Sequence, residues 1–230
     1  MSKKANLHLF KERITLTNYE TLIKELSDAM DSGTEVLTEL LFGTKTPDLY
    51  SNHGTYQCGQ HNRCSGLSFS KNRNFTEKRL CKCLFYRNEN YPMACEKCGF
   101  PERFKVMGDY SIVDYEVPAF YYGDGIGEID LVISDGEVCY ATEVKPYKGN
   151  KETLLRMIAE IMTYTEGYPV GTYKKAIAFF EKNRDDGEKT AQQKEYEVAK
   201  STFFALLKKA DITVFRFEEV GEKAYQICKL

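Results

Sequence analysis

The chain has 230 residues, of which 42% are hydrophobic and 13% aromatic, enough to bury the core of a folded domain. Its formal net charge of −2 excludes a global positive field, so binding to nucleic acid or to an anionic membrane would need a local patch. The N-terminal stretch has no apolar core long enough for a signal peptide, and no run of about 18 apolar residues occurs. We therefore expect a cytoplasmic protein without a membrane partner.

Residues 7–42 predict two helices. Apolar residues recur there at roughly helical spacing, at Leu22, Leu26, Ala29 and Met30 and then at Val36, Leu37, Leu40 and Leu41. A break is expected near Gly33. We assign residues 1–43 to N-terminal helices that pack on a core formed by residues 106–230.

Residues 44–105 lose this periodicity and hold most of the cysteines. Without an export signal, the reducing cytosol favours metal ligation over disulfides. Zinc prefers tetrahedral sites of Cys and His. One four-cysteine site would use Cys81, Cys83, Cys95 and Cys98, and a second would use Cys58, His61 and Cys64, with His53 or no protein group as the fourth ligand. We expect an irregular module with one or two structural Zn²⁺, and an iron–sulfur cluster is the rival.

The same segment carries a basic stretch. Six Lys or Arg residues lie between Lys71 and Arg87 against the single acid Glu77, with aromatic residues interleaved. Positive charge beside stacking side chains is what phosphate tracking and base contact require. The stretch predicts a nucleic-acid grip, and the alternative is a solvated loop.

From residue 106 onward the pattern alternates between strands and helices. Strands are predicted over residues 110–122, 127–133, 137–145, 174–181 and 212–219, and helices over 152–167 and 191–210. This order predicts an α/β fold with one mixed central sheet flanked by helices.

One hairpin of this sheet carries charged residues among its aliphatic ones. The pair Asp135-Gly136 predicts a two-residue type I′ turn, which places Asp130 opposite Ala141. Glu128, Asp130, Glu143 and Lys145 then share one face, with Asp130 and Glu143 as diagonal neighbours whose Cβ atoms lie roughly 7–8 Å apart or slightly less.

Two carboxylates at that separation can bind a divalent cation, and oxygen ligands suit Mg²⁺ or Mn²⁺. The alternative is a solvated face whose charges simply pair. A helix over residues 151–166 should cover this face, which favours the metal site because buried charges need compensation.

The hairpin also carries a resemblance to a known family. Asp130, a short connection and then Glu143-Val144-Lys145 before a helix are similar to the PD-(D/E)XK nuclease superfamily, which includes many restriction endonucleases and recombination-repair nuclease domains. The likeness covers roughly residues 106–181. It implies a restriction-endonuclease-like fold, metal binding by Asp130 and Glu143, and a Lys145 that hydrogen-bonds the attacking water or the transition-state oxygens.

The family also places an acid on a helix before the first strand. Glu35 and Glu39 are the candidates, with Glu39 preferred because it lies near the helix end, and Glu116 competes from the first strand. Some subfamilies carry Gln-x3-Tyr on the helix after the lysine. Here Tyr164 fits this pattern and Glu160 departs from it, which argues against the exonuclease-like subgroup.

Two functions follow as hypotheses. The first is a Mg-dependent deoxyribonuclease, an endonuclease rather than an exonuclease, whose zinc module grips DNA. RNA is the alternative substrate, and a homodimer would suit cutting both strands. The second is a non-catalytic zinc-module protein that binds nucleic acid or a protein on a nuclease-like scaffold. The intact acidic pair and lysine favour the first, because a scaffold has no physical need for them.

Overall fold

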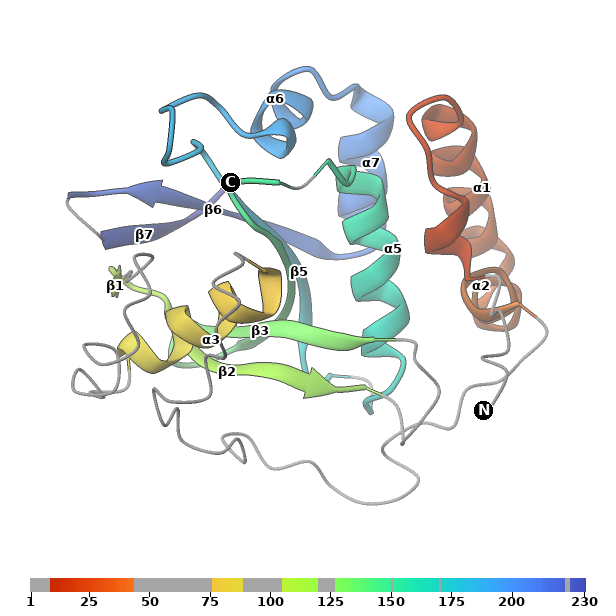
Figure 1. Cartoon of the computed structure of the whole chain (residues 1–230). Helices are drawn as coiled ribbons and strands as arrows, with labels where there is room; N and C mark the ends of the chain where they lie inside the picture. Colours follow the sequence, from red (N-terminus) through yellow and green to blue (C-terminus); the bar gives the residue numbers. More distant parts are fainter. Residues whose placement is uncertain are drawn as a thin grey trace, which may run out of the picture.

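The computed structural model describes residues 9–43, 76–88, 105–119, 127–149, 151–169, 171–221 and 224–230, with the backbone alone for 86–88. These ranges form a mixed α/β fold with one curled sheet, as expected (Figure 1). The helices are η1 (Phe10–Arg13, a 3₁₀ helix), α1 (Tyr19–Ser32), α2 (Thr34–Phe42), α3 (Glu77–Asn88), α5 (Leu154–Thr165), α6 (Ala191–Glu197) and α7 (Ser201–Lys209). The strands are β1 (Lys105–Met107), β2 (Ser111–Pro118), β3 (Glu128–Ser134), β4 (Cys139–Lys145), β5 (Lys174–Phe180), β6 (Ile212–Glu219) and β7 (Ala224–Lys229).

The sheet has the strand order β1-β7-β6-β5-β4-β3-β2. Strands β2, β3 and β4 form an antiparallel meander, and β4, β5 and β6 are parallel neighbours linked by helical crossovers. The five predicted strands are all present. Strands β1 and β7 were not predicted; β1 has only 3 residues, and β7 pairs with both β1 and β6.

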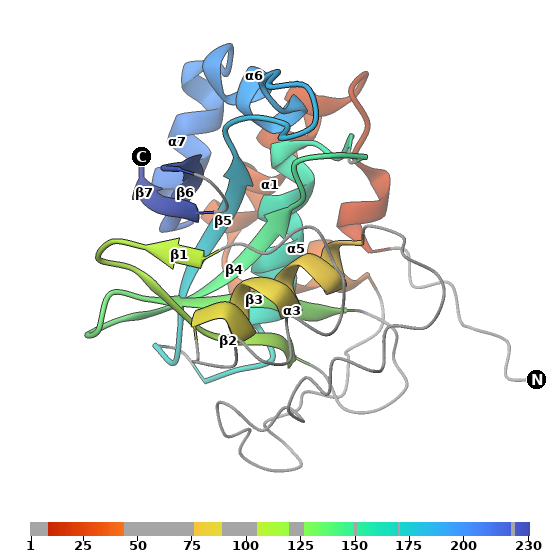
Figure 2. The same ribbon diagram turned by 60° about the vertical axis from the view of Figure 1, so that its left-hand side comes forward.

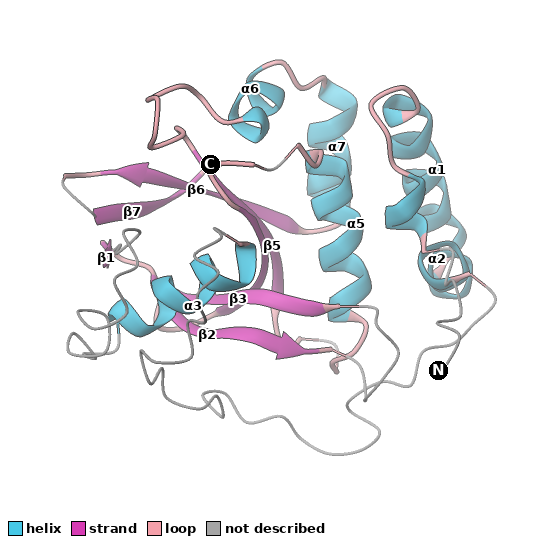
Figure 3. Cartoon of the chain, viewed as in Figure 1, coloured by secondary structure: helices cyan, strands magenta, loops and turns pink. Residues whose placement is uncertain are grey.

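Helices cover both faces of the sheet. Helix α5 lies on one face with α7, and α1 and α2 form a further layer outside them, whereas α3 crosses the opposite face (Figures 2 and 3). Alternate residues of β3 therefore enter different cores: Val132 packs with α5, and Leu131 and Ile133 pack with α3. All three are fully buried, and each contributes about 1.5–3 kcal/mol to folding.

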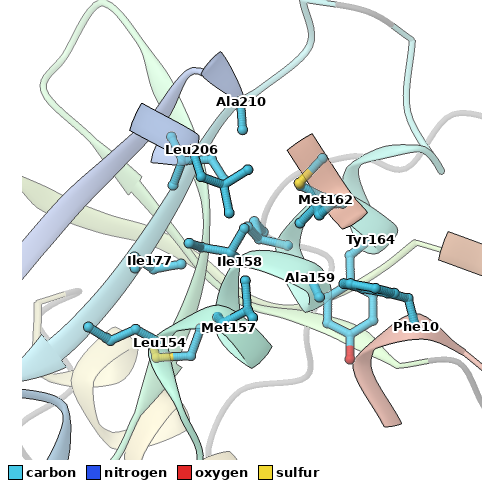
Figure 4. Packing of buried hydrophobic residues seen from close by; sticks show 14 of the residues in the cluster. Phe10, Leu154, Met157, Ile158, Ala159, Met162, Tyr164, Ile177, Leu206 and Ala210 are labelled. Carbon is cyan, nitrogen blue, oxygen red and sulfur yellow. The ribbon is translucent and has the colours of Figure 1, made fainter. Parts of the chain in front are cut away.

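Helix α5 is the centre of the larger core. Figure 4 shows its Ile158 beside Ile177 of β5 and Leu206 of α7, with Phe10 of η1 beside Tyr164. The Thr153 hydroxyl caps the helix by accepting a hydrogen bond from the Arg156 backbone N–H at 3.2 Å. This cap fixes where α5 begins, and so fixes which of its residues face β4.

The expected break between the two N-terminal helices is confirmed, whereas the predictions for residues 77–88 and 191–210 are wrong. Helices α1 and α2 break at Gly33, whose φ is +110°. Residues 77–88, expected to be irregular, form α3 instead. The single helix expected over residues 191–210 is two, because the backbone at Lys200 is extended and α7 starts afresh from it. Across the described ranges, no helix is both long and apolar enough to cross a membrane.

Candidate functional site

The turn between β3 and β4 is longer than the two residues predicted. Asp135 to Val138 form a four-residue connection in which the Asp135 N–H donates to the Val138 carbonyl at 3.3 Å. The Asp135 carboxylate accepts hydrogen bonds from the backbone N–H groups of Glu137 and Val138, at 3.1 and 2.8 Å. The prediction of a type I′ turn is wrong because this side chain stabilises the wider loop.

The wider loop changes which residues of the hairpin oppose each other. The register pairs Leu131 with Thr142, so continuing it by one residue sets Asp130 directly opposite Glu143 rather than diagonal to it. The Val144 N–H donates to Asp130 Oδ2 at 2.9 Å and holds that carboxylate in place. Both acids remain on the face that α5 covers, as the alternation of side chains predicted.

A pocket of about 280 Å³ lies where β3 begins and β4 ends. Its lining is dominated by carboxylates, seven of them against two lysines. The lining residues are Glu77, Lys78, Glu116, Gly127, Glu128, Asp130, Glu143, Lys145, Glu152, Glu160 and Tyr164. Such an excess of negative charge favours a cation as the partner of this pocket.

Three of these acids converge on one point. Glu77, Asp130 and Glu143 each offer one carboxylate oxygen, and these atoms all lie within 4.8 Å of one another. Glu143 is only 2% exposed, and its Oε2 is buried and accepts no hydrogen bond from any part of the chain that the structure describes. Hard oxygen donors at this spacing, one of them without a donor, fit Mg²⁺ or Mn²⁺.

The Lys145 ammonium lies among four carboxylates. Its Nζ is 2.6 Å from Glu143 Oε1, 3.1 Å from Glu77 Oε2, 2.9 Å from Glu152 Oε2 and 3.3 Å from Glu160 Oε2. Burial lowers the pKa of Lys145, but the surrounding carboxylates, Glu143 first, outweigh it and raise the pKa well above its usual range. Lys145 is therefore a fixed positive charge at neutral pH and is unsuited to act as a base. Because Lys145 and Glu143 are buried under α5, the alternative of a solvated face does not apply.

The acids themselves hold protons more tightly than usual. Burial, followed by the charge of Glu77, raises the pKa of Asp130 to about 8, although Lys145 and the Val144 N–H oppose the rise. Burial and then the charge of Asp130 raise the pKa of Glu143, and burial also raises that of Glu77. A divalent cation would have to displace these protons, so its binding is coupled to pH.

Helix α5 brings Glu160 and Tyr164 to the same pocket. Burial raises the pKa of Glu160, but Lys145 and the other nearby cations lower it more, so Glu160 stays ionised. The Tyr164 hydroxyl accepts a hydrogen bond from Lys11 Nζ at 2.7 Å, and burial raises the pKa of Tyr164. Gly127 has a φ of +134° and packs against this hydroxyl so closely that a Cβ at residue 127 would collide with it.

Two acids upstream of Asp130, Glu77 and Glu116, line the pocket, and the preferred candidate Glu39 does not. Glu35 and Glu39 lie exposed on α2 and do not line the pocket, whereas Glu116 does and forms an ion pair with Lys78 at 3.0 Å. From the sequence alone, Glu77 is only the single acid in a basic stretch.

A helical signal was nevertheless present around Glu77. Thr76 precedes it and caps α3 through a 3.2 Å hydrogen bond from the Arg79 N–H, and Leu80 and Leu84 follow at helical spacing. Sequence reasoning also missed Lys11, Glu152 and Arg156. Lys11 reaches Glu160 from a distant segment, whereas Arg156 contacts Glu152 and Glu160 at a spacing of four residues.

Two of the predicted zinc ligands lie in α3. Cys81 is fully buried in the core beneath the helix, where burial and then nearby acids raise the pKa of its thiol. Residues two apart on a helix point in nearly opposite directions, so Cys81 and Cys83 are not placed to bind one ion together. The remaining predicted ligands, His53, Cys58, His61, Cys64, Cys95 and Cys98, lie outside the described residues.

No protein-family profile, curated protein or solved structure matches the chain.

Proposed function

We propose that the chain is a divalent-cation-dependent nuclease that hydrolyses phosphodiester bonds in DNA, with Asp130, Glu143 and Lys145 at the reacting phosphate. One observation carries the proposal: a buried lysine ammonium lies 2.6 Å from Glu143, beside three carboxylates whose oxygens converge within 4.8 Å. A cation site next to a permanently charged lysine is what the hydrolysis of an anionic ester requires. The likeness of the hairpin to the PD-(D/E)XK superfamily points the same way.

The carboxylates would bind the cation, and their negative charge would make the cation necessary for binding a phosphate. Asp130, Glu143 and Glu77 supply the oxygen ligands that Mg²⁺ or Mn²⁺ prefers. When bound, the ion polarises the phosphoryl oxygen and lowers the pKa of water. Without it, the ionised carboxylates of the pocket would repel a phosphate, so substrate binding itself should depend on the cation.

Lys145 would stabilise charge rather than move protons. Its raised pKa keeps it protonated, so it can donate hydrogen bonds to phosphoryl oxygens as negative charge develops on them. The carboxylate of Glu143 holds the ammonium from two residues earlier on β4, at 2.6 Å. Such fixed positioning is the main contribution a protein makes to this class of reaction.

Helix α3 joins the pocket to the basic stretch of the sequence. Its first residue, Glu77, lies in the pocket, and the next, Lys78, lines the pocket with a side chain that is 69% exposed. Lys82 follows one helical turn later. Lysines on the helix that lines the pocket suit a net-acidic chain that binds nucleic acid through a local patch.

The test is cleavage of supercoiled plasmid, linear duplex, single-stranded DNA and RNA in Mg²⁺ or Mn²⁺. Wild-type protein should nick supercoiled DNA, as an endonuclease does. Lys145→Ala should lose at least about a hundredfold in rate, and Lys208→Ala, at an exposed site on α7, should cleave as wild type does.

Each other result has a defined meaning. Cleavage of RNA but not of DNA would mean that the substrate is RNA. No cleavage of any substrate by the folded wild-type protein would support the non-catalytic binding protein instead. Equal cleavage rates for Lys145→Ala and wild type would show that Lys145 has no role in the reaction.

A further inference from the structure

The Tyr164 hydroxyl is held by segments that are far apart in the sequence. Lys11 of η1, a buried lysine, donates from Nζ to the hydroxyl oxygen at 2.7 Å. Gly127, just before β3, approaches the same oxygen so closely that it leaves no room for a Cβ. Figure 4 shows Tyr164 beside Phe10, the residue that precedes Lys11 in η1. The hydroxyl therefore has a fixed position in the pocket that Tyr164 lines.

Stability does not explain why the Lys11 ammonium is buried. A buried ammonium loses its hydration, and attraction to a nearby acid often fails to offset that loss. Lys11 Nζ lies 3.6 Å from Glu160 Oε1. However, Arg156 already lies 3.3 Å from that oxygen, and Lys145 lies 3.3 Å from the other oxygen of Glu160. Because Glu160 is compensated without Lys11, the shorter contact with Tyr164 is the one that calls for a lysine here.

The contact with Lys11 decides how the Tyr164 hydroxyl can bond. An ammonium has no lone pair and only donates, so the Tyr164 oxygen is the acceptor and its own hydrogen is not used. Burial raises the pKa of Tyr164, so the hydroxyl keeps this hydrogen at neutral pH. In the part of the chain that the structure describes, no carbonyl or carboxylate accepts it. With Lys11 and Gly127 against the oxygen, the hydrogen is directed to the space that is left, which is the pocket.

Hydrogen-bond donors are scarce in this pocket. Most of the lining side chains are carboxylates, which only accept hydrogen bonds when ionised. The two lysines of the lining, Lys78 and Lys145, are already paired with carboxylates. Among the described residues that line the pocket, Tyr164 is the only one with a hydroxyl. It is therefore the neutral donor that a phosphoryl oxygen would meet there.

We propose that Lys11 is a positioning residue for the proposed reaction. By occupying one lone pair of the Tyr164 oxygen, Lys11 turns the hydroxyl hydrogen into the pocket, where it bonds to a phosphoryl oxygen of the substrate. Donation from an ammonium also polarises the hydroxyl and makes it a stronger donor. The inference rests on the proposed function, because it takes a phosphodiester as the occupant of the pocket.

The experiment is a double-mutant cycle on Lys11 and Tyr164. Its two readouts are the affinity for inorganic phosphate in Mg²⁺, measured by calorimetry, and the rate of DNA cleavage. Tyr164→Phe keeps the ring and removes the hydroxyl, and Lys11→Met keeps an apolar stem and removes the charge. Each should reduce both quantities about ten- to a hundredfold, the range for a hydrogen bond to a charged group. The double variant should lose no more than either single variant, because Lys11 acts through Tyr164.

Two further variants separate positioning from a merely structural role. Lys11→Arg keeps a cationic donor and should retain most of the phosphate affinity. A structural role would instead favour Lys11→Met, which packs without a buried charge. Arg13→Met removes a neighbouring cation of η1 whose side chain is 46% exposed, and it should behave as wild type. If Lys11→Met does not fold, Lys11→Leu takes its place with the same expectation.

Three results would overturn the inference: wild-type protein that binds no phosphate, a single variant with unchanged phosphate affinity, or losses that add in the double variant. Failure of the proposed function is separable, because phosphate binding is measured without turnover. Coupled losses of phosphate affinity in a protein that cleaves no nucleic acid would refute the nuclease and support the role of Lys11. Cleavage that is unaffected in Lys11→Met would do the reverse.

Discussion

Asp130→Asn should make the stability of the protein less dependent on pH. Asp130 has a pKa of about 8 in the folded protein against an ordinary value of 3.8. Between these values the folded chain keeps a proton that the unfolded chain releases. Stability is therefore fully present at low pH and is lost as pH rises toward 8, the opposite of the usual behaviour of a carboxylate. Asparagine resembles the protonated acid and can still accept the Val144 N–H hydrogen bond.

The size of the effect follows from proton linkage. A group that binds one extra proton in the folded state costs about 1.4 kcal/mol of stability for each pH unit between its two pKa values. Between pH 5 and 7 this gives about 2.7 kcal/mol as the upper limit. Water that enters the half-buried site screens part of the charge, so we expect about 1–3 kcal/mol, or a change in Tm of several degrees for a chain of this length.

The assay is urea unfolding of wild type and Asp130→Asn at pH 5, 6 and 7, without added divalent cations. The difference in stability between the two proteins should grow in favour of the variant as pH rises. Addition of Mn²⁺ at pH 7 should stabilise wild type and have little effect on the variant. Parallel pH profiles for the two proteins would refute the reasoning, because they would mean that Asp130 titrates alike in the folded and unfolded chains.

Three further changes test other parts of the site. Glu77→Gln should weaken Mn²⁺ binding about tenfold or more, measured by calorimetry, whereas Glu39→Gln should not; the reverse order would restore Glu39 as the upstream acid. Cys81→Ala should cost about 1 kcal/mol in chemical denaturation and leave the zinc content by elemental analysis unchanged, and a loss of zinc would contradict its place in the core. Gly127→Ala should lower stability by about 1–3 kcal/mol and displace Tyr164, and an unchanged Tm would mean that the contact between them is loose.

The parts of the fold that sequence predicted are those with local signals. Helix α5 was predictable because its apolar residues repeat at helical spacing and Thr153 caps it. The side of the sheet that carries Asp130 and Glu143 was also predictable, because alternation along a strand survives the error in the turn. The turn itself was not, since Asp-Gly suits a two-residue turn and the competing hydrogen bonds of the Asp135 side chain are not visible in composition.

The parts of the site that escaped prediction depend on contacts between distant segments. Glu77 belongs to a helix whose apolar face is short and lies among basic and cysteine residues. Lys11 and Arg156 resemble ordinary surface cations in the sequence. The contact of Lys11 with Glu160 arises only when η1 packs on α5, whereas Arg156 contacts Glu160 within α5, at a spacing of four residues. The preference for Glu39 relied on position in the chain alone. The structure brings a later helix to the pocket instead.

The wide spacing of the pocket residues along the chain has a consequence for biosynthesis. Lys145 and Glu77 are 68 residues apart, and Lys11 and Tyr164 are 153 apart, so the carboxylates converge only after several long loops have closed. Contacts between such distant residues form late in folding. A nascent chain lacks Glu160 until α5 has been synthesised, so a shorter polypeptide could not assemble the full set of pocket residues. The pocket is therefore complete only after α5 has packed on β4.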